Sequence, residues 1–194
     1  MGFEAMTTAS TGTGYIPSED AKRTGNIQYL YDRRYEVLDA VTADTTYSNS
    51  GSENTFYTFG VAGSTLGTDG LLRLRSGWTW VKEGTNGAFK ITACYAGIQS
   101  ASVQATNGTG TGSGYFVSEF QLKARGATAC QYGILTLGGT NQATGALDFA
   151  SSGGSTAGDS TAAQDLVVTG CMSTARTDWL LTLNWATLEY IAAR

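Results

Sequence analysis

From residue 35 onward, short β-type runs recur along this chain, and clusters of Gly, Asn and Ser separate them. Runs in which bulky apolar and polar residues alternate are typical of half-buried β-strands, and no segment shows a convincing helical period. Roughly ten strands on this spacing predict an all-β, antiparallel fold that is either a β-sandwich or a jelly roll. The expected strands cover residues 35–41, 55–61, 71–81, 88–95, 98–103, 115–124, 128–137, 146–150, 166–171 and 179–190.

Three of these runs alternate most clearly, at residues 71–81, 115–124 and 179–190. The last run is apolar on both faces, which predicts a strand that is central in its sheet or covered by a partner chain. Ser76 and Gly77 interrupt the first run and predict a bulge or bend there. Between the two sheets we expect a core that contains Trp78, Trp80, Phe120, Leu122, Leu181, Leu183 and Trp185.

The first part of the chain differs from the rest, and we expect an extended N-terminal arm over residues 1–34 and the jelly-roll domain over residues 35–194. The arm begins with small polar residues and then concentrates apolar side chains and arginines in a short stretch. Such an arm either adds a strand to a neighbouring sheet edge or folds back along its own domain. The candidate assembly residues are Ile27, Tyr29, Leu30, Tyr31, Arg33 and Arg34.

Three glycine-rich segments, at residues 107–114, 138–141 and 151–158, are expected to be flexible connectors. The first has closely spaced glycines, but the Lys-Ser/Thr ending of a phosphate-binding loop is absent and no helix pattern follows. A structural hairpin loop is therefore the preferred interpretation of that segment.

Histidine is absent from the chain, which removes the commonest zinc ligand and the commonest general base. Hydrolase mechanisms that depend on imidazole are excluded on this ground. The three cysteines are widely separated, and we expect them to be small buried hydrophobic residues in a protein made in a reducing compartment. No cofactor and no metal site are expected.

A carboxylate-based polysaccharide depolymerase would need only two acidic residues that flank the bond to be cleaved. Acidic residues are present without a distinctive spacing, so we expect that the protein is not an enzyme, and the depolymerase is the third interpretation. The residues considered are Glu53, Glu119, Asp148, Asp159 and Asp165.

Acidic residues outnumber basic ones by 16 to 12, and the net charge of −4 opposes binding to nucleic acid or to an anionic membrane surface. No apolar stretch approaches the length of a membrane span, and the N-terminus lacks the pattern of an export signal. Basic residues are nevertheless concentrated between residues 71 and 125, where they form either a mildly basic surface or a scattering of solvated charges. These candidates are Arg73, Arg75, Lys82, Lys90, Lys123 and Arg125.

Five segments carry a recognisable pattern: residues 55–59 (TFYTF), 65–74 (TLGTDGLLRL), 88–97 (AFKITACYAG), 115–122 (YFVSEFQL) and 180–190 (LLTLNWATLEY). Together they resemble the small jelly-roll domains of tailed-bacteriophage virion proteins. The resemblance covers about residues 45 to 194, and the loop before the closing TLEY is shorter here than in the family. It implies a jelly-roll fold and, usually, a homotrimer.

Such domains occur as head decoration proteins, head fibres and tail-fibre tips. The leading functional hypothesis is a non-enzymatic, trimeric capsid decoration (cement) protein, made in the host cytoplasm and bound to the major capsid protein or another virion protein on the outer head surface. The alternative hypothesis is a head or tail fibre component that binds a receptor or a host-surface glycan. Neither hypothesis involves nucleic acid or a membrane as a partner.

Overall fold

The computed structural model describes residues 7–8, 15–16, 35–48, 51–83, 87–107, 111–141, 147–172 and 179–192. The chain divides into two compact units, Met1–Glu36 and Val37–Arg194. In the first unit, β1 (Thr7–Thr8) pairs antiparallel with β2 (Tyr15–Ile16). The arm residues singled out from the sequence lie outside the described residues: Ile27, Tyr29, Leu30, Tyr31, Arg33 and Arg34.

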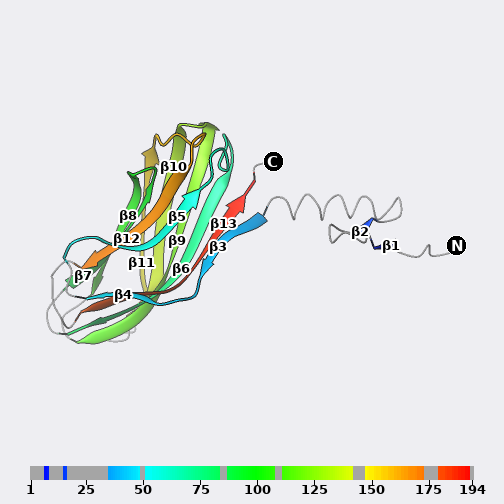
Figure 1. Ribbon diagram of the computed structural model, residues 1–194. Helices are drawn as coiled ribbons and strands as arrows, with labels where there is room; N and C mark the ends of the chain where they lie inside the picture. The colour runs from blue at the N-terminus through cyan, green and yellow to red at the C-terminus, as the bar shows by residue number, and fades with distance from the viewer. Residues whose placement is uncertain are drawn as a thin grey trace. The chain divides into compact units, whose positions relative to one another are not determined.

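Two antiparallel sheets face each other in the second unit (Figure 1). The large sheet has the order β11-β10-β9-β6-β13-β3, and β4 also pairs with β13; the small sheet has the order β5-β12-β7-β8. The expected all-β jelly-roll sandwich is therefore confirmed. The strands are β3 (Tyr35–Val41), β4 (Thr45–Ser48), β5 (Asn54–Val61), β6 (Leu71–Lys82), β7 (Gly87–Tyr95), β8 (Ile98–Asn107), β9 (Gly112–Ala127), β10 (Cys130–Asn141), β11 (Leu147–Thr156), β12 (Gln164–Met172) and β13 (Leu180–Ile191).

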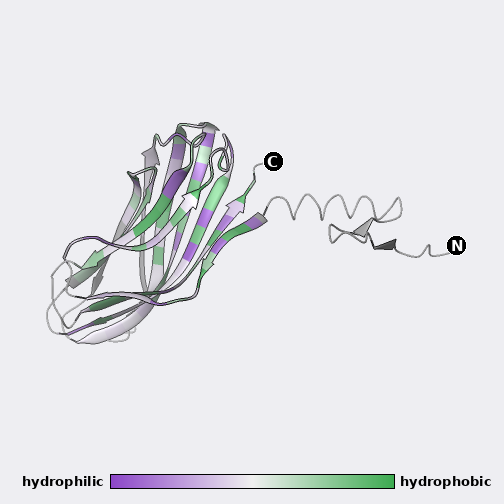
Figure 2. Cartoon of the chain, in the orientation of Figure 1, coloured by the Kyte–Doolittle hydropathy of each residue, from purple (hydrophilic) through white to green (hydrophobic). Residues whose placement is uncertain are grey.

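Aromatic side chains from both sheets form the centre of the core. Trp78 on β6 packs edge-on against Phe56 on β5, with ring centroids 5.0 Å apart, and is stacked at 5.8 Å on Phe116 of β9. Its indole N–H donates to the buried Ser76 and Ser118 hydroxyls at 2.9 and 3.0 Å, so the polar edge of the ring is satisfied inside the core. Figure 2 shows the alternation of hydrophilic and hydrophobic residues along the strands that produces this layer.

Six of the seven residues expected in the core are buried: Trp78, Trp80, Phe120, Leu122, Leu181 and Leu183. The seventh expectation was wrong, because Trp185 is 39% exposed. A β-bulge between Leu183 and Trp185 adds one residue to β13, and one extra residue moves the following side chains to the opposite face. Beyond the bulge, Ala186 and Leu188 are the residues that enter the core.

The strand β13 is central, as expected, since it pairs with β6 on one side and with β3 and β4 on the other. It is not buried on both faces in the single chain, because Leu180 and Trp185 are exposed on the outer face. The bulge expected at Ser76 and Gly77 is also absent from β6, which is continuous; the irregularity lies in its partner strand, opposite Gly77.

Two of the glycine-rich segments are not connectors, which corrects the expectation from composition. Residues 138–141 belong to β10, and residues 151–156 belong to β11, which pairs with β10 along its length. A Cβ atom at Gly139 would lie 2.4 Å from the Cβ of Phe116 and from the carbonyl oxygen of Tyr115. These glycines therefore serve close backbone packing inside strands rather than turns.

Small residues also close one edge of the sandwich, where β8 of the small sheet lies against β10 and β11. A Cβ atom at Gly133 would lie 2.7 Å from the Cβ of Ser100, and one at Gly154 would lie 2.8 Å from the Ser100 carbonyl oxygen. The third glycine-rich segment, residues 107–114, includes the last residue of β8 and the first residues of β9. Because β8 belongs to the small sheet and β9 to the large sheet, these two strands do not form a hairpin, and the hairpin interpretation was wrong.

The tight turn between β7 and β8 is one place where glycine is needed for its conformation. Ala96 and Gly97 both have positive φ angles, of 54° and 71°, as a two-residue hairpin loop requires.

All three cysteines are free; Cys94 and Cys171 are partly buried, whereas Cys130 is exposed, contrary to expectation. Among the described residues, no helix is long and apolar enough to cross a membrane.

Candidate binding surface

The bulge in β13 places a tryptophan on the outer face of the large sheet. Trp185 lies directly over Gly77 of β6: a Cβ atom at Gly77 would be 2.0 to 2.8 Å from three atoms of the indole five-membered ring. Because this glycine has no side chain, the ring rests on the strand backbone and buries Gly77 beneath it. Of the four tryptophans in the chain, the other three have at most 4% of their surface exposed.

Two further exposed apolar side chains, Tyr115 and Val117 on β9, lie beside Trp185. Gly77 pairs with Val117 on one side and with Trp185 on the other, and Tyr115 is in the next row of the sheet, opposite Thr79. Tyr115 is 53% and Val117 is 45% exposed. We call Trp185, Tyr115 and Val117 the aromatic platform. Exposed apolar side chains gathered on neighbouring strands of one face are a candidate interaction site.

A polar row borders the aromatic platform. The Arg75 guanidinium on β6 donates to the Glu119 carboxylate on β9 at 2.9 Å, and the Gln121 amide donates to the same carboxylate. Partial burial acts to raise the pKa of Glu119, but the hydrogen bonds from Gln121 and Arg75 outweigh it and hold the pKa below its ordinary value. The carboxylate is therefore ionised and keeps these side chains oriented on the surface.

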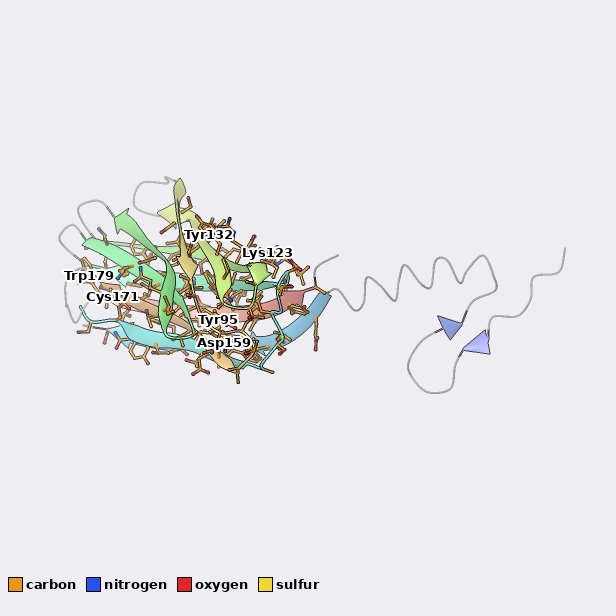
Figure 3. All side chains as sticks on the ribbon, turned by 90° about the horizontal axis from the view of Figure 1, so that it is seen from above. Tyr95, Lys123, Tyr132, Asp159, Cys171 and Trp179 are labelled. Carbon is orange, nitrogen blue, oxygen red and sulfur yellow. The ribbon has the colours of Figure 1, made fainter. Side chains whose placement is uncertain are left out.

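Farther along the same face, charge becomes positive. Arg73 is paired with the nearly buried Glu189 of β13, at 2.6 Å. Lys123 and Arg125 on β9 follow, and Lys123 donates to the backbone carbonyl of Asp69. We call Lys123 and Arg125 the basic end of the face. Lys123 is directly opposite Tyr132 of β10 and beside it in Figure 3, and the Arg125 guanidinium carbon lies 5.9 Å from the centroid of the Tyr132 ring.

The structure thus brings together four of the six basic residues that the sequence singled out, on one face of the large sheet: Arg73, Arg75, Lys123 and Arg125. The other two lie elsewhere. Lys82 is only 2% exposed and contributes little to any surface, and Lys90 is on β7 of the small sheet. Desolvation lowers the pKa of Lys82.

A separate polar cluster lies on the outer face of the small sheet. The Glu53 carboxylate accepts hydrogen bonds from the Lys90 ammonium at 2.6 Å, the Thr169 hydroxyl at 2.9 Å and the Thr92 hydroxyl at 3.2 Å. The hydrogen bond from Lys90 is the main reason why the pKa of Glu53 lies below its ordinary value, although burial opposes it. This cluster ties the segment before β5 to β7 and β12.

The acidic residues considered for catalysis do not converge. Glu53 lies on the small sheet and Glu119 on the large sheet, while Asp159 caps a turn by accepting hydrogen bonds from Thr161. Those bonds lower the pKa of Asp159, as the interactions above lower those of Glu53 and Glu119. A glycosidase acid needs a raised pKa, and none of these three carboxyl groups has one. Asp165 is on β12, Asp148 is on β11, and no group of three metal-ligating side chains occurs among the described residues.

No protein-family model matches the sequence, and no curated protein matches it. Solved structures with a similar arrangement include the CBM2 module of the evolved Dit protein of Lactobacillus casei BL23 phage J-1, with 9% identity over 83% of this chain and 98% of that chain and a TM-score of 0.40. Peanut lectin has 8% identity over 82% and 91%, with a TM-score of 0.37. Arcelin-5, a lectin-like defence protein from Phaseolus vulgaris, has 7% identity over 82% and 93%, with a TM-score of 0.41. These likenesses are distant, so the function of the chain has to be argued from its own side chains.

Proposed function

We propose that this chain is a non-enzymatic glycan-binding module and that sugar rings bind on the aromatic platform. The observation that carries the proposal is the position of Trp185, whose indole covers Gly77 while 39% of the residue remains exposed. A pyranose ring has one face of C–H groups, and such a face packs well against an immobilised indole ring. Aromatic side chains with a few oriented polar groups around them are typical of small-ligand sites.

The neighbours of the platform suit the hydroxyl groups of a sugar. The Arg75–Glu119 pair and the Gln121 amide offer both donors and an ionised acceptor at its border, held in place by their mutual hydrogen bonds. Thr79 and Thr182 add hydroxyl groups in the row of Tyr115, where Thr182 contacts Thr46 at 2.9 Å. Because Gly77 has no side chain, the indole ring can lie close to the β6 backbone.

The test is binding of the purified chain to a panel of immobilised polysaccharides. Trp185→Ala is expected to weaken binding at least about tenfold, because the loss of a stacked aromatic contact removes about 1.4 kcal/mol or more. Ile98→Ala is the matched control, since Ile98 is a similarly exposed apolar residue on the small sheet. Wild-type binding by Trp185→Ala would contradict the proposal.

The same platform could instead join two copies of the chain, and light scattering separates the two uses. Glycan binding predicts that Trp185→Ala leaves the association state unchanged. A change in association state, together with no glycan binding by the wild type, would show that the platform is a protein interface and that the proposal is wrong.

Attachment of this module to a phage particle is a proposal that rests on the sequence resemblance alone. The homotrimer and the position on the capsid as a decoration protein are parts of the same proposal. Quantitative mass spectrometry of purified particles measures the copy number: hundreds of copies would agree with a capsid decoration protein, and a few copies at the tail would agree with a fibre component.

A further inference from the structure

Charge varies systematically along the outer face of the large sheet. On β9, Val117 belongs to the platform, Glu119 and Gln121 to the polar rows, and Lys123 and Arg125 to the basic end. Residues 117 and 123 are six positions apart, which corresponds to about 20 Å at 3.4 Å per residue of antiparallel strand. A ligand that starts at Trp185 and follows the strands therefore reaches the basic end after several sugar units.

The positive charges on this face are not equivalent. Arg75 and Arg73 are neutralised by the Glu119 and Glu189 carboxylates, at 2.9 and 2.6 Å. Lys123 and Arg125 are both exposed, and no ion pair within the described part of the chain includes either of them. Their contacts are with uncharged groups, a backbone carbonyl and the Tyr132 ring. Two positive charges without an ion-pair partner in the described part of the chain thus lie at one end of this face, whereas Arg73 and Arg75 each pair with a carboxylate.

We infer that the ligand of this face is an acidic polysaccharide that carries carboxylate groups, with a sugar ring on Trp185 and a carboxylate at Lys123 and Arg125. This inference rests on the proposed function and specifies its substrate class. The guanidinium of Arg125 presents parallel N–H donors that match a carboxylate, and the Lys123 ammonium adds a second charge. The overall charge of −4 opposes general binding of polyanions, so recognition requires the local arrangement on this face.

The experiment compares three polymers: a polyuronate, the same polymer after reduction of its carboxyl groups to alcohols, and a poly(glycerol phosphate). The full chain is titrated with each polymer at low and high salt. The polyuronate is expected to bind about tenfold more tightly than its reduced form, with the difference lost at high salt because the charges are exposed. Equal affinity for the two forms would overturn the inference, as would stronger binding of the poly(glycerol phosphate).

Variants separate this inference from the proposed function. The double variant Lys123→Gln/Arg125→Gln is expected to bind the polyuronate about tenfold more weakly and to bind the reduced polymer as the wild type does. Lys90→Gln, which removes a cation from the small sheet, is the control and should leave both affinities unchanged. Wild-type affinity of the double variant for the polyuronate would overturn the inference.

Trp185→Ala tests the proposed function itself, since it should weaken binding of both the polyuronate and its reduced form. If Trp185→Ala keeps wild-type affinity for both polymers, the proposed function fails. If it loses both while the double variant loses neither, the proposed function stands and the acidic substrate class is wrong. Thermal unfolding of each variant confirms that the folded state is retained in the comparison.

Discussion

At the scale of single residues, tryptophan has two roles in this protein, and the degree of burial of the side chain distinguishes them. Trp80 is buried and contacts Phe89 of the small sheet, with ring centroids 5.5 Å apart. Trp185 lies on the outer face, where solvent still reaches its ring. The core therefore depends on Trp80, whereas the surface chemistry depends on Trp185.

We expect Trp80→Ala to lower the free energy of unfolding by about 3–5 kcal/mol, because it leaves a large cavity between the sheets. Trp185→Ala should cost clearly less, because much of its ring is already in contact with water. Urea denaturation measures both values. A Trp80→Ala variant as stable as the wild type would show that the packing between the sheets does not depend on this ring.

Gly77 and Trp185 should be coupled, because a Cβ atom at Gly77 would lie 2.0 Å from the indole nitrogen. In the wild type, Gly77→Ala is expected to destabilise the protein and to displace the ring. In a Trp185→Ala background the same change should be neutral or stabilising, because alanine costs less chain entropy than glycine. A double-mutant cycle should yield a coupling of about 0.5–3 kcal/mol, and a coupling near zero would contradict the position of the ring.

At the scale of the strands, glycines inside β5 and β10 have different environments. Gly139→Ala brings a Cβ atom within 2.4 Å of Phe116 and the Tyr115 carbonyl, so β9 and β10 must separate. We expect a loss of about 1–3 kcal/mol in the free energy of unfolding. Gly60→Ala is the matched control on β5, where the nearest atom, Asp165 Oδ1, would be 3.8 Å away and the change should be tolerated. Equal stability of the two variants would show that β10 does not need a glycine there.

Glu53 connects three segments of the small sheet, and its lowered pKa makes that connection pH-dependent. A carboxyl group whose pKa is lower in the folded state than in the unfolded state stabilises the protein above the unfolded pKa. That stability is lost as the pH falls from about 5 through the lowered folded pKa. We therefore expect Glu53→Gln to lose less stability than the wild type between about pH 5 and pH 3.

Lys90→Met provides an independent check of the same contact. It removes the hydrogen bond that contributes most to the lowered pKa of Glu53. The variant should therefore also lose less stability than the wild type as the pH falls. Thermal unfolding across this pH range measures the effect. Unchanged acid sensitivity in both variants would mean that other carboxylates determine the loss of stability.

At the scale of the whole molecule, we predict that the arm assists assembly and that the sandwich folds without it. A truncation that starts at Tyr35 retains all of β3 and every strand of both sheets. It should melt near the wild-type temperature but fail to join the proposed trimer or the proposed phage particle. An insoluble truncated chain would show instead that the arm completes the fold of its own domain.

The amino-acid sequence by itself determined the fold class and most of the core. Alternation with a period of two is a local property, and it placed Trp78 and Trp80 on the inner face of β6 correctly. The absence of histidine likewise excluded a class of mechanisms without any structure. The concentration of basic residues between residues 71 and 125 identified the part of the chain that contains the basic end, Lys123 and Arg125.

The candidate site depended on tertiary structure. A single extra residue in β13 moved Trp185 from the expected core to the surface, and the pattern around Asn184 carries no signal for it, because a bulge depends on how two strands are paired. Likewise, glycines at residues 138–141 and 151–158 have the composition of loops but lie in or next to strands, since close contacts with Phe116 and Ser100 exclude a Cβ atom. Those contacts join residues far apart in the sequence, and only the packed sheets bring them together.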